Sequence, residues 1–211
     1  MKRRNALQLI AAAAFALSIA PWASAQVAGK DYLPISPVQP GGTGGQVDII
    51  EFFSYECPHC YEFDPLLAKW RARQPADVNF HRVPVSFGNP KWAAAQQMYL
   101  TLEAMKLNDK LDTAVFEGIH KQRVNFASEK TRNEWLSKQG VDVKQFNDTW
   151  RSFGVGAQIK RAEQLAELYK VQGVPSMAID GKFMAQGAGH EELLRNTDLL
   201  ITKARLEKGK K

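Results

Sequence analysis

The most constraining feature of this chain is an apolar run that leads directly into a pair of cysteines. Residues 47–53, VDIIEFF, are rich in β-branched and aromatic residues and are long enough for one buried strand. The sequence YECPHCYEF follows at residues 55–63, and apolar residues continue from it at helical spacing. Pro58 suits the first turn of such a helix, where its missing N–H costs nothing. The pattern therefore predicts a strand, a short turn and a helix, with Cys57 at the helix N-terminus.

Cys57 and Cys60 are the only cysteines in the 211 residues. A bridge between them closes a loop of a few residues, and the stabilisation that a disulfide gives is smallest for short loops. A metal clip normally needs further ligands, and the sequence has neither a second CxxC nor a clear pair of other ligands at helical spacing. The pattern favours a redox pair, with an inert bridge and a metal site as alternatives.

The predicted position of Cys57 has a chemical consequence. Unpaired backbone N–H groups and the positive end of the helix dipole stabilise a negative sulfur, so we expect a lowered pKa for this thiol. His59 adds a donor or a positive charge, and Pro58 removes one N–H and stiffens the turn. A thiol with a low pKa is a good leaving group, so a mixed disulfide at Cys57 should resolve quickly.

The first 25 residues have the pattern of a secretory signal peptide. A basic start precedes a short apolar stretch, and Ala23-Ser24-Ala25 fits a cleavage site that leaves Gln26 as the new N-terminus. The alternative is an uncleaved anchor, although residues 9–20 are short for a membrane-spanning helix. Cleavage leaves 25 basic and 22 acidic residues, so the net charge falls from +6 to +3. This mild charge gives no case for a nucleic-acid partner.

Two segments together resemble a known family. EFFSYECPHCYEF at residues 51–63 and GVPSMAIDGKF at residues 173–183 are similar to the DsbA family of bacterial periplasmic dithiol oxidases. The similarity extends from about Tyr32 to the C-terminal helix. It implies that the Cys57–Cys60 disulfide is donated to exported proteins with free thiols. It also implies re-oxidation by a DsbB-like membrane quinone reductase. We expect a periplasmic monomer, and the sequence predicts no cofactor and no metal.

The resemblance implies an α/β, thioredoxin-like fold with an inserted all-helical domain, and the rest of the sequence fits it. We expect the thioredoxin-like domain at residues 26–86 and 158–211 and the inserted domain at residues 87–157. Residues 77–85 predict a second core strand, and Asp180-Gly181 predicts a hairpin turn. Ser128 and Asp142 are expected helix N-caps. The Pro- and Gly-rich residues 29–46 allow at best an edge strand, at residues 32–38.

The resemblance to the family also implies a role for the loop that contains Val174 and Pro175. It implies a cis Val174–Pro175 bond in a loop that faces the cysteines and pairs its backbone with an extended substrate segment. Val174, Pro175 and His59 are therefore the expected substrate-binding residues. The alternative for Pro175 is an ordinary proline at the start of a strand.

Glu51 is the one acidic residue on a strand face that is otherwise apolar. A buried carboxylate is costly without a partner or a purpose. The matching family position implies a proton acceptor for Cys60, reached through water, and the alternative is a glutamate paired with a lysine. The three histidines outside the motif, His81, His120 and His190, are expected to be structural.

Two other functions remain open at this stage. A disulfide isomerase or reductase uses the same cysteine pair but must be kept reduced, and isomerases of this family carry a dimerisation domain for which this sequence has no room. A redox-inactive binding or chaperone module would make the thiol chemistry incidental. The favoured prediction is a protein disulfide oxidase whose catalytic residues are Cys57, Cys60, His59, Pro58, Pro175 and Glu51.

Overall fold

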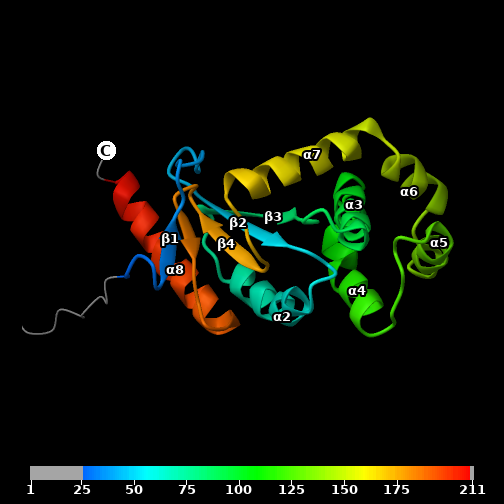
Figure 1. Cartoon of the computed structure of the whole chain (residues 1–211), viewed down its shortest axis with the longest axis horizontal. Helices are drawn as coiled ribbons and strands as arrows, with labels where there is room; N and C mark the ends of the chain where they lie inside the picture. The colour runs from blue at the N-terminus through cyan, green and yellow to red at the C-terminus, as the bar shows by residue number, and fades with distance from the viewer. Residues whose placement is uncertain (1–25, 210–211) are drawn as a thin grey trace, which may run out of the picture.

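The computed structural model describes residues 26–209, which form one five-stranded sheet and seven helices (Figure 1). The strands are β1 (Tyr32–Pro34), β2 (Val47–Phe53), β3 (Val78–Pro84), β4 (Ser176–Ile179) and β5 (Phe183–Ala185). The helices are α2 (Pro58–Ala72), α3 (Pro90–Ala104), α4 (Asn108–His120), α5 (Glu129–Lys138), α6 (Val143–Trp150), α7 (Phe153–Leu168) and α8 (His190–Lys208). The expected mixed α/β fold class is confirmed. The expected signal peptide lies outside the described residues.

The order of the strands in the sheet is β1-β5-β4-β2-β3. β2 pairs in parallel with β3 and antiparallel with β4, so it has a neighbour on both sides and is almost entirely buried. β1 forms the opposite edge, as expected for its Pro-rich segment. The prediction that residues 77–85 form a core strand is wrong in one respect. β3 is an edge strand, and its first residues are partly exposed because no strand lies beyond them.

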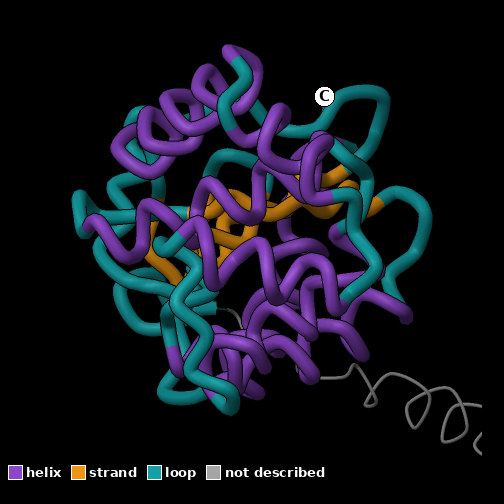
Figure 2. Tube along the Cα trace, turned by 90° about the vertical axis from the view of Figure 1, so that its right-hand side faces the viewer, coloured by secondary structure: helices purple, strands orange, loops and turns teal. Residues whose placement is uncertain are grey.

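Helices cover both faces of the sheet, which runs through the middle of the molecule in Figure 2. Side chains alternate along β2, so Val47 and Ile49 pack against α2 and α8. Phe52, on the opposite face, packs against Ala162 and Tyr169 at α7. This two-sided burial is why the run VDIIEFF is apolar at almost every position.

The helices between β3 and β4 form their own core and extend it to the cysteines. One hydrophobic cluster contains residues of α3 to α7 together with Phe53, Tyr55, Cys57 and Cys60. Ser128 and Asp142 cap α5 and α6 as predicted, since their side chains accept hydrogen bonds from Thr131 N and Gln145 N. The expected domain boundary between residues 157 and 158 falls inside the continuous helix α7.

The predicted hairpin turn connects β4 to β5. Asp180 and Gly181 both have positive φ, at 52° and 65°, as in a type I′ turn, and Lys182 N donates to Ile179 O at 3.0 Å. A Cβ atom at residue 181 would lie 2.1 Å from the main-chain oxygen of Gln39, so this turn requires glycine. Among the helices of residues 26–209, none has the length and apolar character needed to cross a membrane.

Candidate active site

Cys57 is the N-cap residue of α2, as the sequence predicts. Its backbone is extended (φ −83°, ψ 118°), and Pro58 begins the helix. The main-chain oxygen of Cys57 accepts from Tyr61 N at 3.1 Å, which closes the first helical turn. Both thiols are free, and Cys57 keeps 5% of its surface exposed while Cys60, one turn later, keeps none. Of the two cysteines, only Cys57 therefore retains contact with solvent.

The pKa values of the two thiols are shifted in opposite directions. The pKa of Cys57 is lowered from 9.0 to about 6, chiefly because the Cys60 thiol donates a hydrogen bond to its sulfur. Burial opposes this shift, and the backbone N–H groups of Cys60 and His59 and the charge of His59 add to it. The pKa of Cys60 is raised far above its ordinary value, mainly by burial. At neutral pH the reduced pair thus carries one thiolate, on Cys57.

Glu56 precedes Cys57, and a carboxylate in this position would oppose thiolate formation. Its side chain is 5% exposed and forms an ion pair with Lys91, whose Nζ lies 2.7 Å from Glu56 Oε2. Lys91 lies in the first turn of α3. This partner offsets the charge of Glu56 beside the thiol.

The loop before β4 lies against Cys57. The Val174–Pro175 peptide bond is cis, as expected, and the main-chain oxygen of Val174 lies 3.4 Å from Cys57 Sγ, where it can accept a hydrogen bond from the protonated thiol. Val174 and Pro175 are both partly exposed. The structure thus brings together Cys57 and the loop to which the family resemblance assigns substrate binding.

Glu51 lies on β2, in register with Arg82 on β3 and Met177 on β4, and is fully buried. Arg82 Nε donates to Glu51 Oε2 at 2.5 Å and Arg82 Nη2 donates to Oε1 at 3.3 Å. Burial raises the pKa of Glu51 to about 7 against the opposing effect of Arg82. The partner of Glu51 is therefore an arginine, whereas the alternative interpretation of Glu51 expected an ion pair with a lysine. The charge of Glu51 also raises the pKa of Cys60.

Arg82 also binds two further carboxylates that the sequence analysis did not predict as its partners. Its Nη1 donates to Asp64 on α2 at 3.2 Å and to Asp112 on α4 at 3.3 Å. The hydroxyl of Tyr55 donates to Asp112, and the Arg82 guanidinium lies 4.0 Å from the centre of the Phe53 ring. One buried cation thus faces three carboxylates. The only signal in the sequence was a charged residue in the middle of an otherwise strand-like segment.

The histidines outside the motif occupy three different environments. His81 is exposed on the edge strand β3. His120 on α4 forms a 2.8 Å hydrogen bond with the main-chain oxygen of Tyr55, and its ring stacks on that of Tyr61 at 4.8 Å. His190, the first residue of α8, lies with its ring centre 6.4 Å from that of His59. The structure therefore places His120 and His190 beside the cysteine segment, and their structural role stays a prediction.

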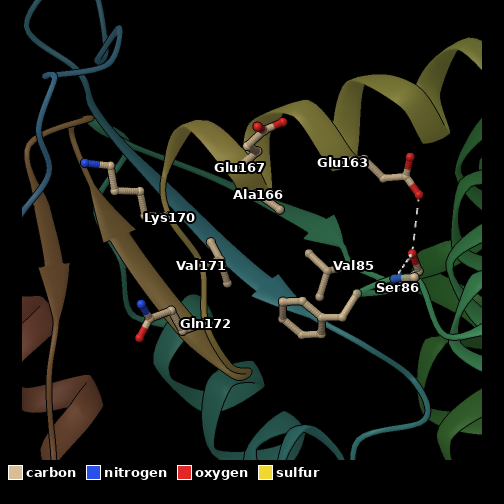
Figure 3. Close-up of a pocket in the computed structure, with 10 residues that line it drawn as sticks. Val85, Ser86, Glu163, Ala166, Glu167, Lys170, Val171 and Gln172 are labelled. Carbon is tan, nitrogen blue, oxygen red and sulfur yellow. Dashed lines mark hydrogen bonds between the residues drawn. The ribbon is translucent and has the colours of Figure 1, made fainter.

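Several cavities open on the part of the protein formed by residues 26–209 and lie away from the thiols. One of about 570 Å³ lies between α7 and the segment after β3, and borders Gln172, which leads towards the Val174–Pro175 loop. Figure 3 shows Glu163, Ala166 and Glu167 of α7 on one side of it and Val85 and Ser86 on the other. Ser86 Oγ donates to Glu163 Oε1 at 3.3 Å across this space. None of the proposed catalytic residues lines this cavity.

Known proteins resemble this chain in both sequence and fold. Residues 48–197 match the family described as the DSBA-like thioredoxin domain. The thiol:disulfide interchange protein DsbA of Pseudomonas aeruginosa is 38% identical over 206 residues, which are 96% of this chain and 97% of the relative. The DsbA of Bordetella pertussis is 36% identical over 211 residues, with 97% and 100% covered.

Solved structures of DsbA proteins have the same fold as this chain. The crystal structure of Pseudomonas aeruginosa DsbA has a TM-score of 0.83 to this structure at 38% identity, and the match covers 89% of this chain and 98% of the other. The oxidoreductase DsbA from Xylella fastidiosa has a TM-score of 0.81 at 31% identity, with 86% and 98% covered. The similarity therefore spans the sheet, the helices between β3 and β4, and the segment with both cysteines.

Proposed function

The chain belongs to the DsbA-like thioredoxin family and is a thiol:disulfide oxidoreductase of oxidative protein folding, and from this we propose roles for its individual residues. Cys57 is the residue that exchanges disulfides with substrate, and Cys60 is its resolving partner. The observation that carries this assignment is the opposite acidity of the two thiols, with a pKa of about 6 for Cys57 and a raised pKa for Cys60.

The proposed reaction begins with the oxidised enzyme. A substrate thiolate attacks Cys57 Sγ, the Cys57–Cys60 bond breaks, and Cys60 leaves as a thiolate that takes up a proton. A second substrate thiolate then attacks the substrate sulfur of the mixed disulfide and expels the Cys57 thiolate. The substrate gains a disulfide, and its two electrons remain on the reduced enzyme. The low pKa of Cys57 favours the last step because a stable thiolate is a good leaving group.

Glu51 supports the proton transfer at Cys60. Its pKa of about 7 means that both of its protonation states are populated at neutral pH. It can therefore give a proton to the Cys60 thiolate during substrate oxidation and accept one during re-oxidation, through an intervening water. Arg82 keeps the carboxylate in position by two hydrogen bonds.

Substrate binds beside the cysteines. We assign this role to Val174, Pro175 and His59, because the Val174 oxygen lies 3.4 Å from Cys57 Sγ and His59 is exposed in the same turn. An extended substrate segment can pair with the backbone of this loop as an added strand. Pro58 and Pro175 offer no N–H that would compete for the sulfur.

The family and the pattern of the first 25 residues support a proposal for the cellular setting. We propose that the protein acts in the periplasm as a monomer, after removal of residues 1–25, on exported proteins with free thiols. A DsbB-like membrane quinone reductase re-oxidises it. The division into a thioredoxin-like part, residues 26–86 and 158–211, and an inserted helical part, residues 87–157, belongs to the same proposal.

The reduction potential of the Cys57–Cys60 pair tests the direction of the reaction. The potential is measured by equilibrating the protein with glutathione. We expect a value more oxidising than about −180 mV, which is the potential of protein disulfide isomerase. A value near that of thioredoxin, about −270 mV, would instead favour a reductase. Dithiol oxidation by the wild type and by Cys57→Ser tests the binding-module alternative, because a redox-inactive module shows no difference between them.

A further inference from the structure

Three side chains with metal-binding chemistry meet beside the reactive cysteine. His59 and Glu62 lie three residues apart on one face of α2, and His190 begins α8. One ligand atom from each of the three lies within 4.8 Å of the other two. The cluster joins segments separated by more than a hundred residues, so the fold alone assembles it.

One of the three spacings, between His59 and Glu62, is close to that around a tetrahedral ion. Zn²⁺ binds histidine nitrogen and carboxylate oxygen at about 2.1 Å, so two tetrahedral ligands lie roughly 3.4 Å apart. His59 Nδ1 and Glu62 Oε2 are 3.5 Å apart. The side chains of His59 and Glu62 are 73% and 62% exposed, so both can adjust their rotamers to include His190.

We propose that His59, Glu62 and His190 bind one divalent transition-metal ion of the Zn²⁺ type, with the remaining coordination position open to solvent. Two imidazoles and one carboxylate suit Zn²⁺, and the site has too few oxygen ligands for Mg²⁺ or Ca²⁺. The inference does not rest on the proposed function, since neither thiol is a ligand.

The surrounding charges set a limit on the affinity. The positive ends of the dipoles of α2 and α8 oppose a cation at this position. Glu62 and the first-turn residues Glu191 and Glu192 of α8 supply negative charge that offsets them. We therefore expect micromolar binding, which weakens at acidic pH because protons compete for the imidazoles.

Calorimetric titration of the oxidised protein, residues 26–211 without an affinity tag, tests the site directly. The disulfide removes both thiols as ligands, so bound Zn²⁺ reports the histidines and carboxylates. We expect one ion per chain in the wild type, at least about tenfold weaker binding in His190→Gln, and no binding of Mg²⁺. His81→Gln is the matched control, because His81 is exposed on β3 and should leave the affinity unchanged.

Two results overturn the proposal: an oxidised wild type that binds no Zn²⁺ at submillimolar concentration, or a His190→Gln variant that binds it as tightly as the wild type. His190 also contacts the ring of Phe63, with ring centres 5.3 Å apart, so circular dichroism should check the fold of the variant. If His190→Gln unfolds, Glu62→Gln decides by the same criterion, since the exposed Glu62 side chain can be replaced without loss of packing.

Discussion

Arg82 and Glu51 form a buried ion pair that joins β3 to β2, with the Arg82 side chain 4% exposed and that of Glu51 not exposed at all. Asp64 and Asp112 complete a group of three carboxylates around the single guanidinium. A cation in this position is held by all three acids, and none of them has another buried cation as a partner among residues 26–209. The pair therefore links the stability of the fold to the carboxyl group that we propose for proton transfer at Cys60.

Replacing Arg82 with Met should strongly destabilise the protein. The variant keeps an unbranched apolar side chain but leaves three carboxylates without their cation, and breaking a buried ion pair costs about 3–5 kcal/mol. Urea unfolding at pH 7 measures this loss, which should shrink at acidic pH as the carboxylates take up protons. Arg73→Met is the control, because Arg73 pairs with Asp198 at the surface and should cost less than about 1 kcal/mol.

The reduced protein should be alkylated selectively at Cys57. Its pKa of about 6 gives a large thiolate fraction at mildly acidic pH, whereas the raised pKa of Cys60 keeps that thiol protonated. Iodoacetamide at pH 6 followed by peptide mapping should find the label on Cys57 alone. Equal labelling of both cysteines would contradict the acidity assigned to the helix N-terminus.

Glu51→Gln should slow the attack of Cys60 on a mixed disulfide between Cys57 and glutathione, by about tenfold or more at pH 7. Loss of the Glu51 charge alone would lower the pKa of Cys60 and speed this attack, so a slower reaction isolates the proton-acceptor role. The rate should also lose the inflection near pH 7 that Glu51 gives to the wild type.

Asp112→Asn is the matched control for this experiment. It removes another carboxylate from Arg82 but leaves Glu51 in place. An equal loss of rate in both variants would mean that the carboxylates around Arg82 affect the rate only by maintaining the local structure. Glu51 would then not be the group that transfers the proton.

Pro175→Thr should make mixed disulfides with substrate accumulate. The N atom of residue 175 is bonded to the same carbonyl carbon as the Val174 oxygen that lies 3.4 Å from Cys57 Sγ. Threonine introduces an N–H next to the sulfur and adds a branched side chain at the place where the second substrate thiol must approach. Non-reducing gels should show covalent complexes that dithiothreitol removes, and their absence would refute the role assigned to this loop.

The reduced protein should be more stable than the oxidised protein at pH 7. The folded pKa of Cys57, about 6, lies below its ordinary value of 9.0, so the thiolate contributes stability that is fully present above about pH 9 and is lost as the pH falls through 6. The advantage of the reduced form should thus grow between these two values. The entropy of the short disulfide loop opposes it only weakly.

Urea unfolding of both redox forms between pH 5 and pH 9 measures this difference, with Cys57→Ser/Cys60→Ser as a reference without thiols. An oxidised form that is the more stable one at pH 7 would falsify the oxidase assignment in its present form. It would favour a reductase or a structural bridge.

The sequence by itself determined the local parts of this protein. The strand VDIIEFF, the helix that begins after Cys57, the caps at Ser128 and Asp142 and the Asp180-Gly181 turn all follow from residues a few positions apart. Backbone preferences, capping and turn geometry act over this short range, so a single sequence is sufficient to predict them. The Val174–Pro175 loop was predicted as well, but through the resemblance of its motif.

Only the tertiary structure decided which charged groups meet. Arg82 lies 31 residues from Glu51, and Lys91 and His190 lie far along the chain from Glu56 and His59. The edge position of β3 was likewise settled by the pairing of the strands. The chain has many acids and bases of similar local context, and pattern alone does not distinguish their possible pairings. Packing selects among them, because a charge removed from water is stable only where the fold supplies its partner.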